Sequence, residues 1–413
     1  MKKLEVFGAK KLKGQIRISG SKNASLPILA ATLLSSKKIY LKNLPKVKDI
    51  ETMIVLLESL GSKIKKIKDK ISIDNSNQKK TFASYNLVKT MRGSILVLGP
   101  LLAKFKKAKV SSPGGCTIGV RPIDIHLKAL SKLGVNYKID QGYVIASAPK
   151  GLIGAKIRFP KISVGATENL IIAASFAKGT TYLSNCAIEP EIKDLVNFLK
   201  KMGCNIKWAT KRSIKIVGVT EVRETNYTVM FDRIEAGTYM VAAAVTEGNL
   251  KIKSIIPSII KTEINVLRNI GAKISCKKNE IHIIGNKKIK SVNIRTAPYP
   301  GFPTDLQAQI MVLLCKANKK SIIKEEIFEN RFMHVAELNR MGAQISTEGN
   351  KAIINGNIKF QSAELMATDL RASVSLILAA LVSKGRSVIN RIYHLDRGYE
   401  DIEKKMKKIG AKI

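Results

Sequence analysis

The chain has 413 residues, of which 45% are hydrophobic. This length exceeds one ordinary core and the composition excludes a disordered chain, so we expect two well-packed domains. The net charge of +41 would suit a nucleic-acid binder, but the cations are spread along the whole chain and no aromatic–basic motif for base stacking is present. We therefore favour a solvated basic surface, which would help to gather an anionic substrate, and expect no nucleic-acid partner.

The five cysteines and four histidines indicate neither a disulfide framework nor a metal site. The cysteines are widely spaced, odd in number and form no CxxC pair, and the histidines form no metal-binding cluster. No dinucleotide fingerprint, signal peptide or apolar run approaching about 18 residues is found. The sequence thus predicts a cytoplasmic protein without a metal, a cofactor or a membrane association.

The first elements predicted along the chain are two strands, Leu4–Gly8 and Gln15–Ser19, with no helix before them. After them, a helix-end signature of an apolar residue followed by Gly recurs six times. The glycines are Gly61, Gly134, Gly203, Gly271, Gly342 and Gly410, separated by steps of 68–73 residues. Because Gly suits the left-handed residue that ends a helix, this period predicts six repeated units of about 70 residues.

Each unit reads as two helices and about four strands, so the predicted class is α/β. In one copy, strands at Ala272–Ser275 and Glu280–Ile284 are followed by an apolar helix at Leu306–Leu314. The sixth unit stops at Ile413 without its later strands, and we expect the N-terminal strands to complete it. Three units per domain predict one domain of residues 1–21 plus 230–413 and a second of residues 22–229.

In every unit, one turn leads from a strand into the apolar helix. These turns are Gly20–Asn23, Met91–Ser94, Ser163–Asn169, Asp232–Glu235, Tyr299–Asp305 and Thr368–Arg371. Ordinary N-capping accounts for Ser21 and Thr304. It does not account for Lys22, Arg92 or Arg371, which are poor caps but suit the binding of phosphates at helix N-termini.

A second family of turns precedes the other helix of each unit. The turn Ser112–Gly119 is Gly-rich and holds Cys116, and the turn His394–Glu400 holds Arg397. A lone Cys is more often a small buried hydrophobe. Here the glycines predict an exposed loop with Arg121 nearby, which favours a reactive thiol on a closing lid.

At these residues the sequence resembles the UDP-N-acetylglucosamine enolpyruvyl transferases, over essentially the whole chain. The motifs that carry the resemblance are Ser21–Ala24, Pro113–Cys116, Arg121–His126, Gly165–Asn169, Pro298–Asp305, Phe328–His334, Thr368–Arg371 and Arg397–Glu400. The resemblance implies a two-domain fold of inside-out α/β barrels, each of three repeated units, with the site between them.

The resemblance also implies the reaction: the enolpyruvyl group of phosphoenolpyruvate is added to the 3′-hydroxyl of UDP-N-acetylglucosamine, and phosphate is then eliminated. This reaction commits precursors to peptidoglycan, and so to the cell wall, cell shape and cell division. By resemblance, Asp305 is the base, and Cys116 is an acid or a covalent group and the site of fosfomycin inactivation. Lys22, Arg121 and Arg397 supply cations, with Arg371 near the substrate carboxylate. Nearby cations favour a thiolate while an acid must hold its proton, so both roles of Cys116 stay open.

The resemblance implies that Asn23 and Asp305 hold the amino sugar. It places the following residues at the UDP site: Arg92, Arg121, Pro122, Ile123, Asp124, Ile125, Lys161, Ser163, Val164, Gly165 and Ile327. For Asp369, Glu329 and Asp232–Glu235, catalytic assistance and structural contacts both stay open.

Two alternative functions stay open. One is 3-phosphoshikimate 1-carboxyvinyltransferase, which shares the fold and the reaction, although the Gly-Gly-Cys loop and Arg121–His126 speak against it. The other is an inactive homologue that binds polyanions. The oligomeric state is not indicated.

Overall fold

The computed structural model of the chain describes residues 3–8, 11–89, 91–112 and 123–413. Apart from the positions it leaves out, the chain divides into two compact units. Among the described residues, the terminal unit comprises 3–8, 11–19 and 231–413, and the central unit comprises 20–89, 91–112 and 123–230. Along the described residues, the chain passes between the units near residue 20 and near residue 230.

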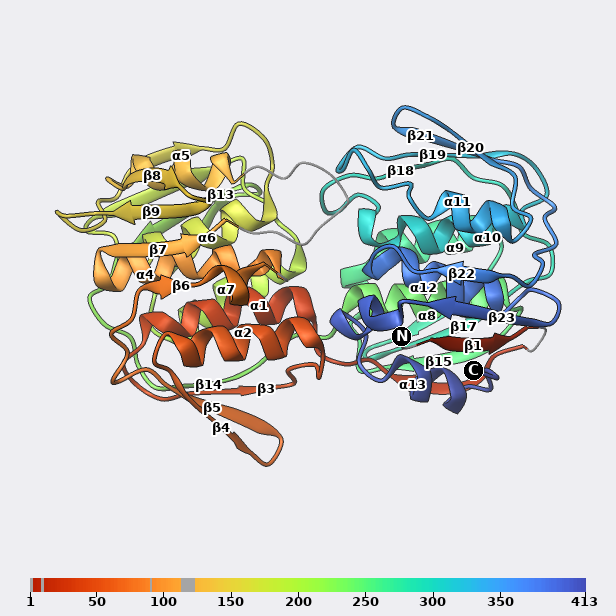
Figure 1. Cartoon of the computed structure of the whole chain (residues 1–413), viewed down its shortest axis with the longest axis horizontal. Coiled ribbons are helices and arrows are strands. Elements are labelled where there is room, and N and C mark those ends of the chain that lie inside the picture. The colour runs from red at the N-terminus through yellow and green to blue at the C-terminus, as the bar shows by residue number, and fades with distance from the viewer. Residues whose placement is uncertain (1–2, 9–10, 90, 113–122) are drawn as a thin grey trace. The chain divides into compact units, whose positions relative to one another are not determined.

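The central unit alternates helices with short strands (Figure 1). Its helical elements are α1 (Lys22–Ala31), η1 (Thr32–Leu34), α2 (Lys48–Ser59), α3 (Tyr85–Val88), η2 (Arg92–Val97), α4 (Leu98–Phe105), α5 (Asp124–Lys132), α6 (Val164–Ala174) and α7 (Pro190–Lys201). Its strands are β3 (Ile39–Lys42), β4 (Lys63–Ile67), β5 (Lys70–Asp74), β6 (Phe82–Ala83), β7 (Lys107–Ser111), β8 (Asn136–Asp140), β9 (Tyr143–Ser147), β10 (Lys156–Arg158), β11 (Thr180–Ser184), β12 (Asn205–Thr210), β13 (Ser213–Val217) and β14 (Thr225–Thr228).

The terminal unit repeats the pattern. Its helical elements are α8 (Arg233–Val245), η3 (Pro257–Ile260), α9 (Lys261–Ile270), η4 (Thr304–Leu306), α10 (Gln307–Cys315), α11 (Val335–Arg340), α12 (Leu370–Ala380), η5 (Ile392–Arg397) and α13 (Ile402–Lys408). Its strands are β1 (Leu4–Phe7), β2 (Lys13–Arg17), β15 (Asn249–Lys253), β16 (Lys273–Lys277), β17 (Glu280–Ile284), β18 (Ile294–Arg295), β19 (Ser321–Lys324), β20 (Ile345–Glu348), β21 (Lys351–Ile354), β22 (Glu364–Met366) and β23 (Arg386–Asn390).

In the part of the chain that is described, the strands form six small sheets, three in each unit. The orders are β14-β3-β5-β4, β6-β7-β9-β8 and β10-β11-β13-β12 in the central unit, and β16-β17-β15-β2, β18-β19-β21-β20 and β1-β23-β22 in the terminal unit. Each sheet has one parallel pair, such as β10 with β11 on either side of α6, and its other pairs are antiparallel. This recurring sheet confirms the repeated α/β units that the glycine spacing predicts.

The two strands that precede the crossings are exchanged between the units. β2 comes just before α1 in the chain, but it pairs in parallel with β15 of the terminal unit. β14 comes just before α8, but it pairs in parallel with β3 of the central unit. Each crossing therefore leaves a sheet of one unit and enters a helix of the other.

The N-terminal strands only partly complete the sixth unit. β1 pairs with β23, with Leu4 opposite Ile389, as the sequence predicts. The prediction is wrong for β2, which pairs with β15. The parallel edge of the β15 sheet is free for β2 because β14 pairs instead with β3 of the central unit.

Helices form the interior of each unit and sheets cover it, which is the inside-out arrangement. Every residue of α8 and of α10 is buried, whereas β15 alternates, with Leu250 and Ile252 inside and its other residues exposed. Figure 1 shows strands on the outside of the helices in each unit. Each unit has its own hydrophobic cluster, because helices that are apolar on all sides must be enclosed.

The six glycines of the repeat all have the left-handed backbone that the pattern predicts. Their φ angles lie between +87° at Gly342 and +118° at Gly271. A residue with a Cβ is strained in this region, so each Gly permits its helix to end and the next strand to begin.

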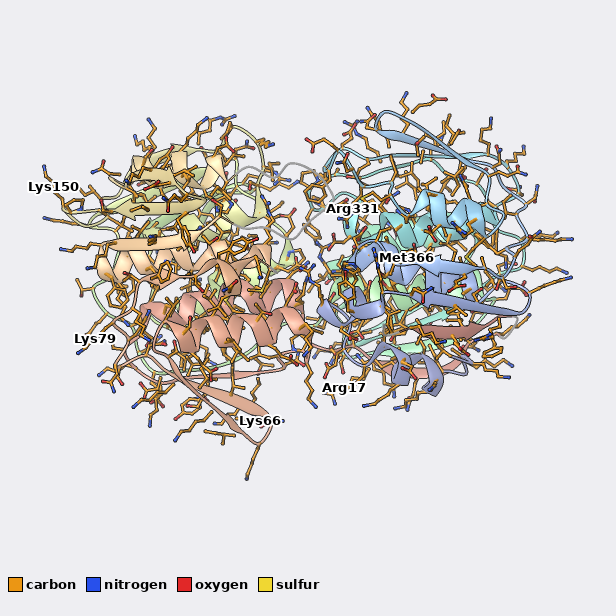
Figure 2. The ribbon with its side chains drawn as sticks, viewed as in Figure 1. Arg17, Lys66, Lys79, Lys150, Arg331 and Met366 are labelled. Atoms are coloured by element: carbon orange, nitrogen blue, oxygen red, sulfur yellow. The ribbon has the colours of Figure 1, made fainter. Side chains whose placement is uncertain are left out.

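The excess of Lys lies largely in solvated side chains. Figure 2 shows Lys66, Lys79 and Lys150 extending from the central unit, and all three are exposed. Long Lys side chains cover apolar surface with their stems while the ammonium stays in water. In the described residues, no helix has the length and apolar character needed to cross a membrane.

Gly134 offers a test of the helix-end assignment, because its φ is +90° and the nearest atom to an added Cβ is 3.9 Å away. We expect Gly134→Ala to destabilise the chain by about 1 kcal/mol through backbone strain alone. Urea unfolding measures this, with the exposed Lys132→Ala as the control, which should change little. Equal stability of the two variants would contradict the assignment.

Candidate active site

The predicted site residues divide between the two units. The central unit holds Lys22, Asn23, Arg92, Ile123, Asp124, Ile125, Lys161, Ser163, Val164 and Gly165, and the terminal unit holds Asp305, Ile327, Arg371 and Arg397. Cys116, Arg121 and Pro122 lie outside the described residues.

In the central unit, four of these residues are the first residue of a helical element. Lys22 begins α1, Arg92 begins η2, Asp124 begins α5 and Val164 begins α6. α1 packs against η2 and α6, and α6 packs against α5. Helix starts expose backbone N–H groups and the positive end of the dipole, so this cluster suits an anionic ligand.

Lys22 is held by a buried ion pair. Its Nζ lies 3.1 Å from Oδ2 of Asp49, in the first turn of α2, and the side chains are only 11% and 6% exposed. Directly before it, the Ser21 hydroxyl accepts a hydrogen bond from the N–H of Ala24, 3.2 Å away, and so caps α1. Lys22 is thus a cation on a rigid helix start, directed by Asp49.

Asp305 lies between two arginines in the terminal unit. Nη2 of Arg331 donates to its Oδ1 at 2.9 Å, and Nε of Arg371 donates to its Oδ2 at 3.2 Å. Both arginine side chains are about 5% exposed, whereas that of Asp305 is 26% exposed. The result is a partly exposed carboxylate that two buried guanidinium groups contact through charge-assisted hydrogen bonds.

Arg331 is a site residue that the sequence interpretation missed. It belongs to the motif Phe328–His334 but received no role there. Arg331 could have been recognised because it is an Arg within a motif, in a chain whose cations are mostly Lys. Arg forms the bidentate contacts with carboxylates that Lys cannot form.

Arg371 keeps its charge despite burial. Burial alone would lower the pKa of Arg371, but Tyr399 and Asp305 raise it and the net shift is upward. Its guanidinium lies 5.2 Å from the centroid of the Tyr399 ring. Its Nη2 also lies 3.1 Å from Oδ2 of Asp305, so the guanidinium meets this carboxylate through both Nε and Nη2.

Glu325, also missed, ties together two predicted segments. Its Oε2 accepts from the Thr304 hydroxyl at 2.9 Å, and its Oε1 accepts from the N–H of Ile327 at 2.8 Å. Thr304 is therefore not the N-cap that the sequence suggests, because its hydroxyl donates to a buried carboxylate next to it. Through these two hydrogen bonds, Glu325 joins the turn that contains Asp305 to the segment that contains Ile327.

Most of the acidic residues with open roles serve structure in this unit. Asp232 caps α8, accepting from the N–H groups of Ile234 and Glu235. Asp369 caps α12, accepting from the N–H of Arg371 at 2.8 Å and from that of Ala372 at 3.1 Å. The cap of Asp369 therefore fixes the backbone of Arg371.

Glu235 and Glu329 differ from those caps. Glu235 accepts hydrogen bonds from the Lys405 ammonium and from the N–H of Ser19, all within the terminal unit. Glu329 is an exposed residue in a turn.

Arg397 ends η5, which packs on α12, the helix of Arg371. Gly398 permits this approach, since a Cβ there would lie 2.6 Å from Cδ2 of Leu370. Burial lowers the pKa of His394, and the positive charge of Arg397 lowers it further. The terminal unit thus gathers Arg331 and Arg371 around Asp305, with Arg397 on the neighbouring turn.

Three of the described thiols are unsuited to chemistry at neutral pH. Burial raises the pKa of Cys186 and of Cys315 to about 12 and that of Cys204 to about 11. Cys276 is exposed. In the ranges that are described, no group of three His, Cys, Asp or Glu side chains could hold a metal ion.

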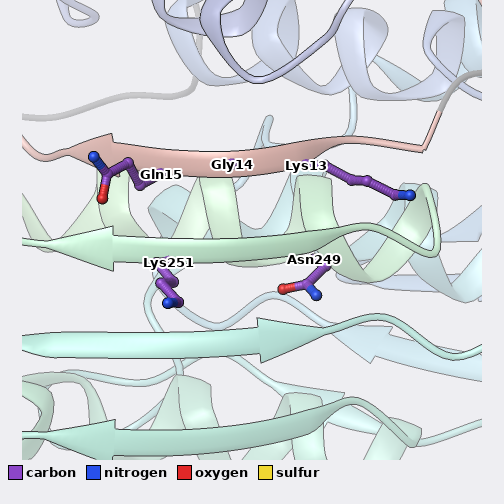
Figure 3. Close-up of a pocket in the computed structure, with 5 residues that line it drawn as sticks. All are labelled: Lys13, Gly14, Gln15, Asn249 and Lys251. Atoms are coloured by element: carbon purple, nitrogen blue, oxygen red, sulfur yellow. The ribbon is translucent and has the colours of Figure 1, made fainter.

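A groove of about 350 Å³ lies over β2 and β15, lined by Lys13, Gly14, Gln15, Asn249 and Lys251 (Figure 3). None of these residues is a predicted site residue. It is a basic groove on the outside of a sheet, and neither a carboxylate nor a thiol is among its lining residues.

Comparisons of the whole chain point to one family of enzymes. A family model described as EPSP synthase (3-phosphoshikimate 1-carboxyvinyltransferase) matches residues 6–406. A curated UDP-N-acetylglucosamine 1-carboxyvinyltransferase of Pelagibacter ubique (strain HTCC1062) is 77% identical over 413 residues, covering 100% of this chain and 99% of the relative. One of the same name from Geotalea uraniireducens (strain Rf4) is 51% identical over the same coverage.

Solved structures share the fold at low sequence identity. A crystal structure of the enolpyruvyl transferase NikO from Streptomyces tendae has a TM-score of 0.90 at 24% identity, covering 98% of this chain and 97% of that one. A structure of EPSP synthase from Acinetobacter baumannii has a TM-score of 0.77 at 18% identity, covering 99% and 98%. These likenesses confirm the fold.

The buried pair of Glu235 and Lys405 predicts a pH effect on stability. Burial raises the pKa of Glu235 to about 7, although Lys405 lowers it. A carboxyl whose pKa is raised by folding stabilises the fold fully below its unfolded pKa of about 4.5, and this contribution is lost as the pH rises towards 7. Relative to Glu235→Gln, the wild type should therefore lose stability between pH 4.5 and 7.

Urea unfolding at several pH values measures the difference between the two proteins. The exposed Glu51→Gln is the control and should show no such trend. A difference that stays flat, or that grows in favour of the wild type with rising pH, would show that the carboxylate is not destabilised by burial.

Proposed function

Because the chain belongs to the EPSP synthase family of enolpyruvyl transferases, we propose that it transfers the enolpyruvyl group of phosphoenolpyruvate to the 3′-hydroxyl of UDP-N-acetylglucosamine and releases phosphate. The observation that carries this proposal is the full-length identity of 77% to a relative with that name. The likeness to EPSP synthase, at 18% identity, speaks for the fold alone. The shikimate reaction is therefore the weaker candidate.

Phosphoenolpyruvate brings a phosphate and a carboxylate, which require several cations. We assign Lys22, Arg121 and Arg397 to these groups, with Arg371 at the carboxylate. The contacts of Asp305 support adding Arg331, because Arg331 and Arg371 donate to the same carboxylate and could each turn a donor to a substrate carboxylate. In this proposal, Asn23 and Asp305 bind the amino sugar.

The UDP moiety is assigned to the helix starts of the central unit, together with Ile327. Arg92, Asp124 and Val164 begin η2, α5 and α6, and Lys161 is exposed just before α6. Exposed N–H groups at these first turns support binding of a diphosphate.

In the addition step, Asp305 accepts the proton of the sugar hydroxyl as its oxygen attacks C2 of phosphoenolpyruvate, while C3 takes a proton. In the elimination step, C3 loses a proton and phosphate leaves from C2. Arg331 and Arg371 donate to the two oxygens of Asp305 and so fix the orientation of the carboxylate assigned as the base. Cys116 is assigned to C3, as an acid or as a covalent group.

This reaction would place the chain in the cytoplasm, at the first committed step of peptidoglycan precursor synthesis, with consequences for cell shape and division. Both substrates are soluble anions, and the chain's net charge of +41 favours their approach.

The proposal predicts that phosphate is released only when phosphoenolpyruvate and UDP-N-acetylglucosamine are both present. A phosphate assay with each substrate omitted in turn measures this, and shikimate 3-phosphate in place of the UDP-sugar should give no release. Faster phosphate release with shikimate 3-phosphate than with the UDP-sugar would establish the alternative reaction. If no phosphate is released with either acceptor, both reactions are excluded.

Cys116→Ser should lose most of the activity and the inactivation by the epoxide fosfomycin, because a hydroxyl is a much weaker nucleophile and acid than a thiol. Cys276→Ser is the matched control, since Cys276 is the exposed thiol among the described cysteines. It should keep both properties. A Cys116→Ser protein with normal rate and normal inactivation would refute the role given to this thiol.

A further inference from the structure

His126 lies in the interior of the central unit, directly behind the start of α5. It is the third residue of that helix and is 7% exposed. It follows Asp124 and Ile125, both assigned above to the UDP moiety. Its ring also touches the start of α6: a Cβ on Gly165 would lie 3.2 Å from its Cε1. Gly165 therefore permits a close approach of the two helix starts.

The partner of His126 is Asn169, a fully buried residue of α6. Its Oδ1 accepts from the N–H of Gly99 at 2.8 Å. Its Nδ2 donates to the carbonyl of Ile95 at 3.2 Å and lies 3.2 Å from Nδ1 of His126. Every polar atom of the amide side chain is therefore used, and the amide presents an N–H to the ring.

This arrangement requires a neutral ring in one tautomer. Because Asn169 donates, Nδ1 of His126 must accept, and the ring proton belongs on Nε2. Burial, with Arg92, lowers the pKa of His126 to about 4, and Asp124 raises it less. In a charged ring, the N–H of Nδ1 would face the N–H of the Asn169 amide. The hydrogen bonds of the network are therefore all formed only when the ring is neutral.

The network connects three segments that meet at the proposed UDP site. Ile95 belongs to η2, which Arg92 begins; His126 belongs to α5, which Asp124 begins; and Asn169 belongs to α6, at whose start Gly165 lies. A fully satisfied buried network is rigid and sets one position for the elements that it joins. The backbone of the turns assigned to the UDP moiety therefore depends on the two buried side chains of His126 and Asn169.

We propose that His126 and Asn169 are positioning residues for the uridine diphosphate of the substrate: they hold η2, α5 and α6 in register so that their first turns fit the diphosphate and its nucleoside. This inference rests on the proposed function. It predicts that breaking the pair weakens binding of the UDP-sugar while the handling of phosphoenolpyruvate is little affected.

The test compares His126→Leu, which cannot accept from Asn169, with His126→Gln, whose carbonyl can. His126→Leu should raise KM for UDP-N-acetylglucosamine and its Kd by about tenfold, the effect of one lost buried hydrogen bond. KM for phosphoenolpyruvate and kcat should change by less than about threefold. His126→Gln should keep most of the wild-type affinity for UDP-N-acetylglucosamine. If His126→Leu does not fold, the affinity of His126→Gln for the UDP-sugar is the measurement that is used.

The matched control is Asn75→Ala, which removes another buried amide of the central unit whose Nδ2 donates to the carbonyl of Thr32 at 2.7 Å. It should lower the melting temperature without a selective change in KM. The inference is overturned if His126→Leu keeps wild-type affinity for the UDP-sugar, or if it changes both KM values in parallel, as a general loss of stability would. A wild type that neither binds nor turns over the UDP-sugar would instead overturn the proposed function.

Discussion

Both units depend on one constraint, which is that their central helices are buried on every side. In the terminal unit, every residue of α8 and α10 is buried. In the central unit, α1 is buried except at Asn23 and α6 except at Val164 and Gly165, all in the first turn. The polar backbone groups of these helices can therefore meet water or a ligand only at the helix ends. The N–H groups of a first turn must find acceptors. Ser21, Asp232 and Asp369 supply some of them. The same packing that encloses the helices therefore leaves their first turns as the places where the proposed function puts the anionic groups.

The surroundings of Asp305 hold two buried cations. Arg331 and Arg371 share its carboxylate, and Asp232 and Tyr399 also act on the charge of Arg371. Buried cations are costly unless they are paired. Arg331 and Arg371 each meet this requirement through the carboxylate of Asp305.

Each unit also has a buried polar network behind its ligand-facing turns. In the central unit, Asn169 and His126 join three helix starts. In the terminal unit, Nε2 of Gln309 donates to the carbonyl of Asp305 at 2.9 Å and to the Thr238 hydroxyl at 3.2 Å. These buried side chains limit where the first turns can lie.

The sequence by itself determined the six repeats, the glycine helix ends and the presence of Lys22, Asp305 and Arg371 at helix starts, because these are features of neighbouring residues. Tertiary structure alone decided what those residues contact. Arg331 and Arg371 are 26 and 66 residues from Asp305, and the exchange of β2 and β14 pairs strands from opposite parts of the chain. Local patterns report backbone conformation, whereas pairing across such separations depends on how the helices pack, and that packing is a property of the whole unit.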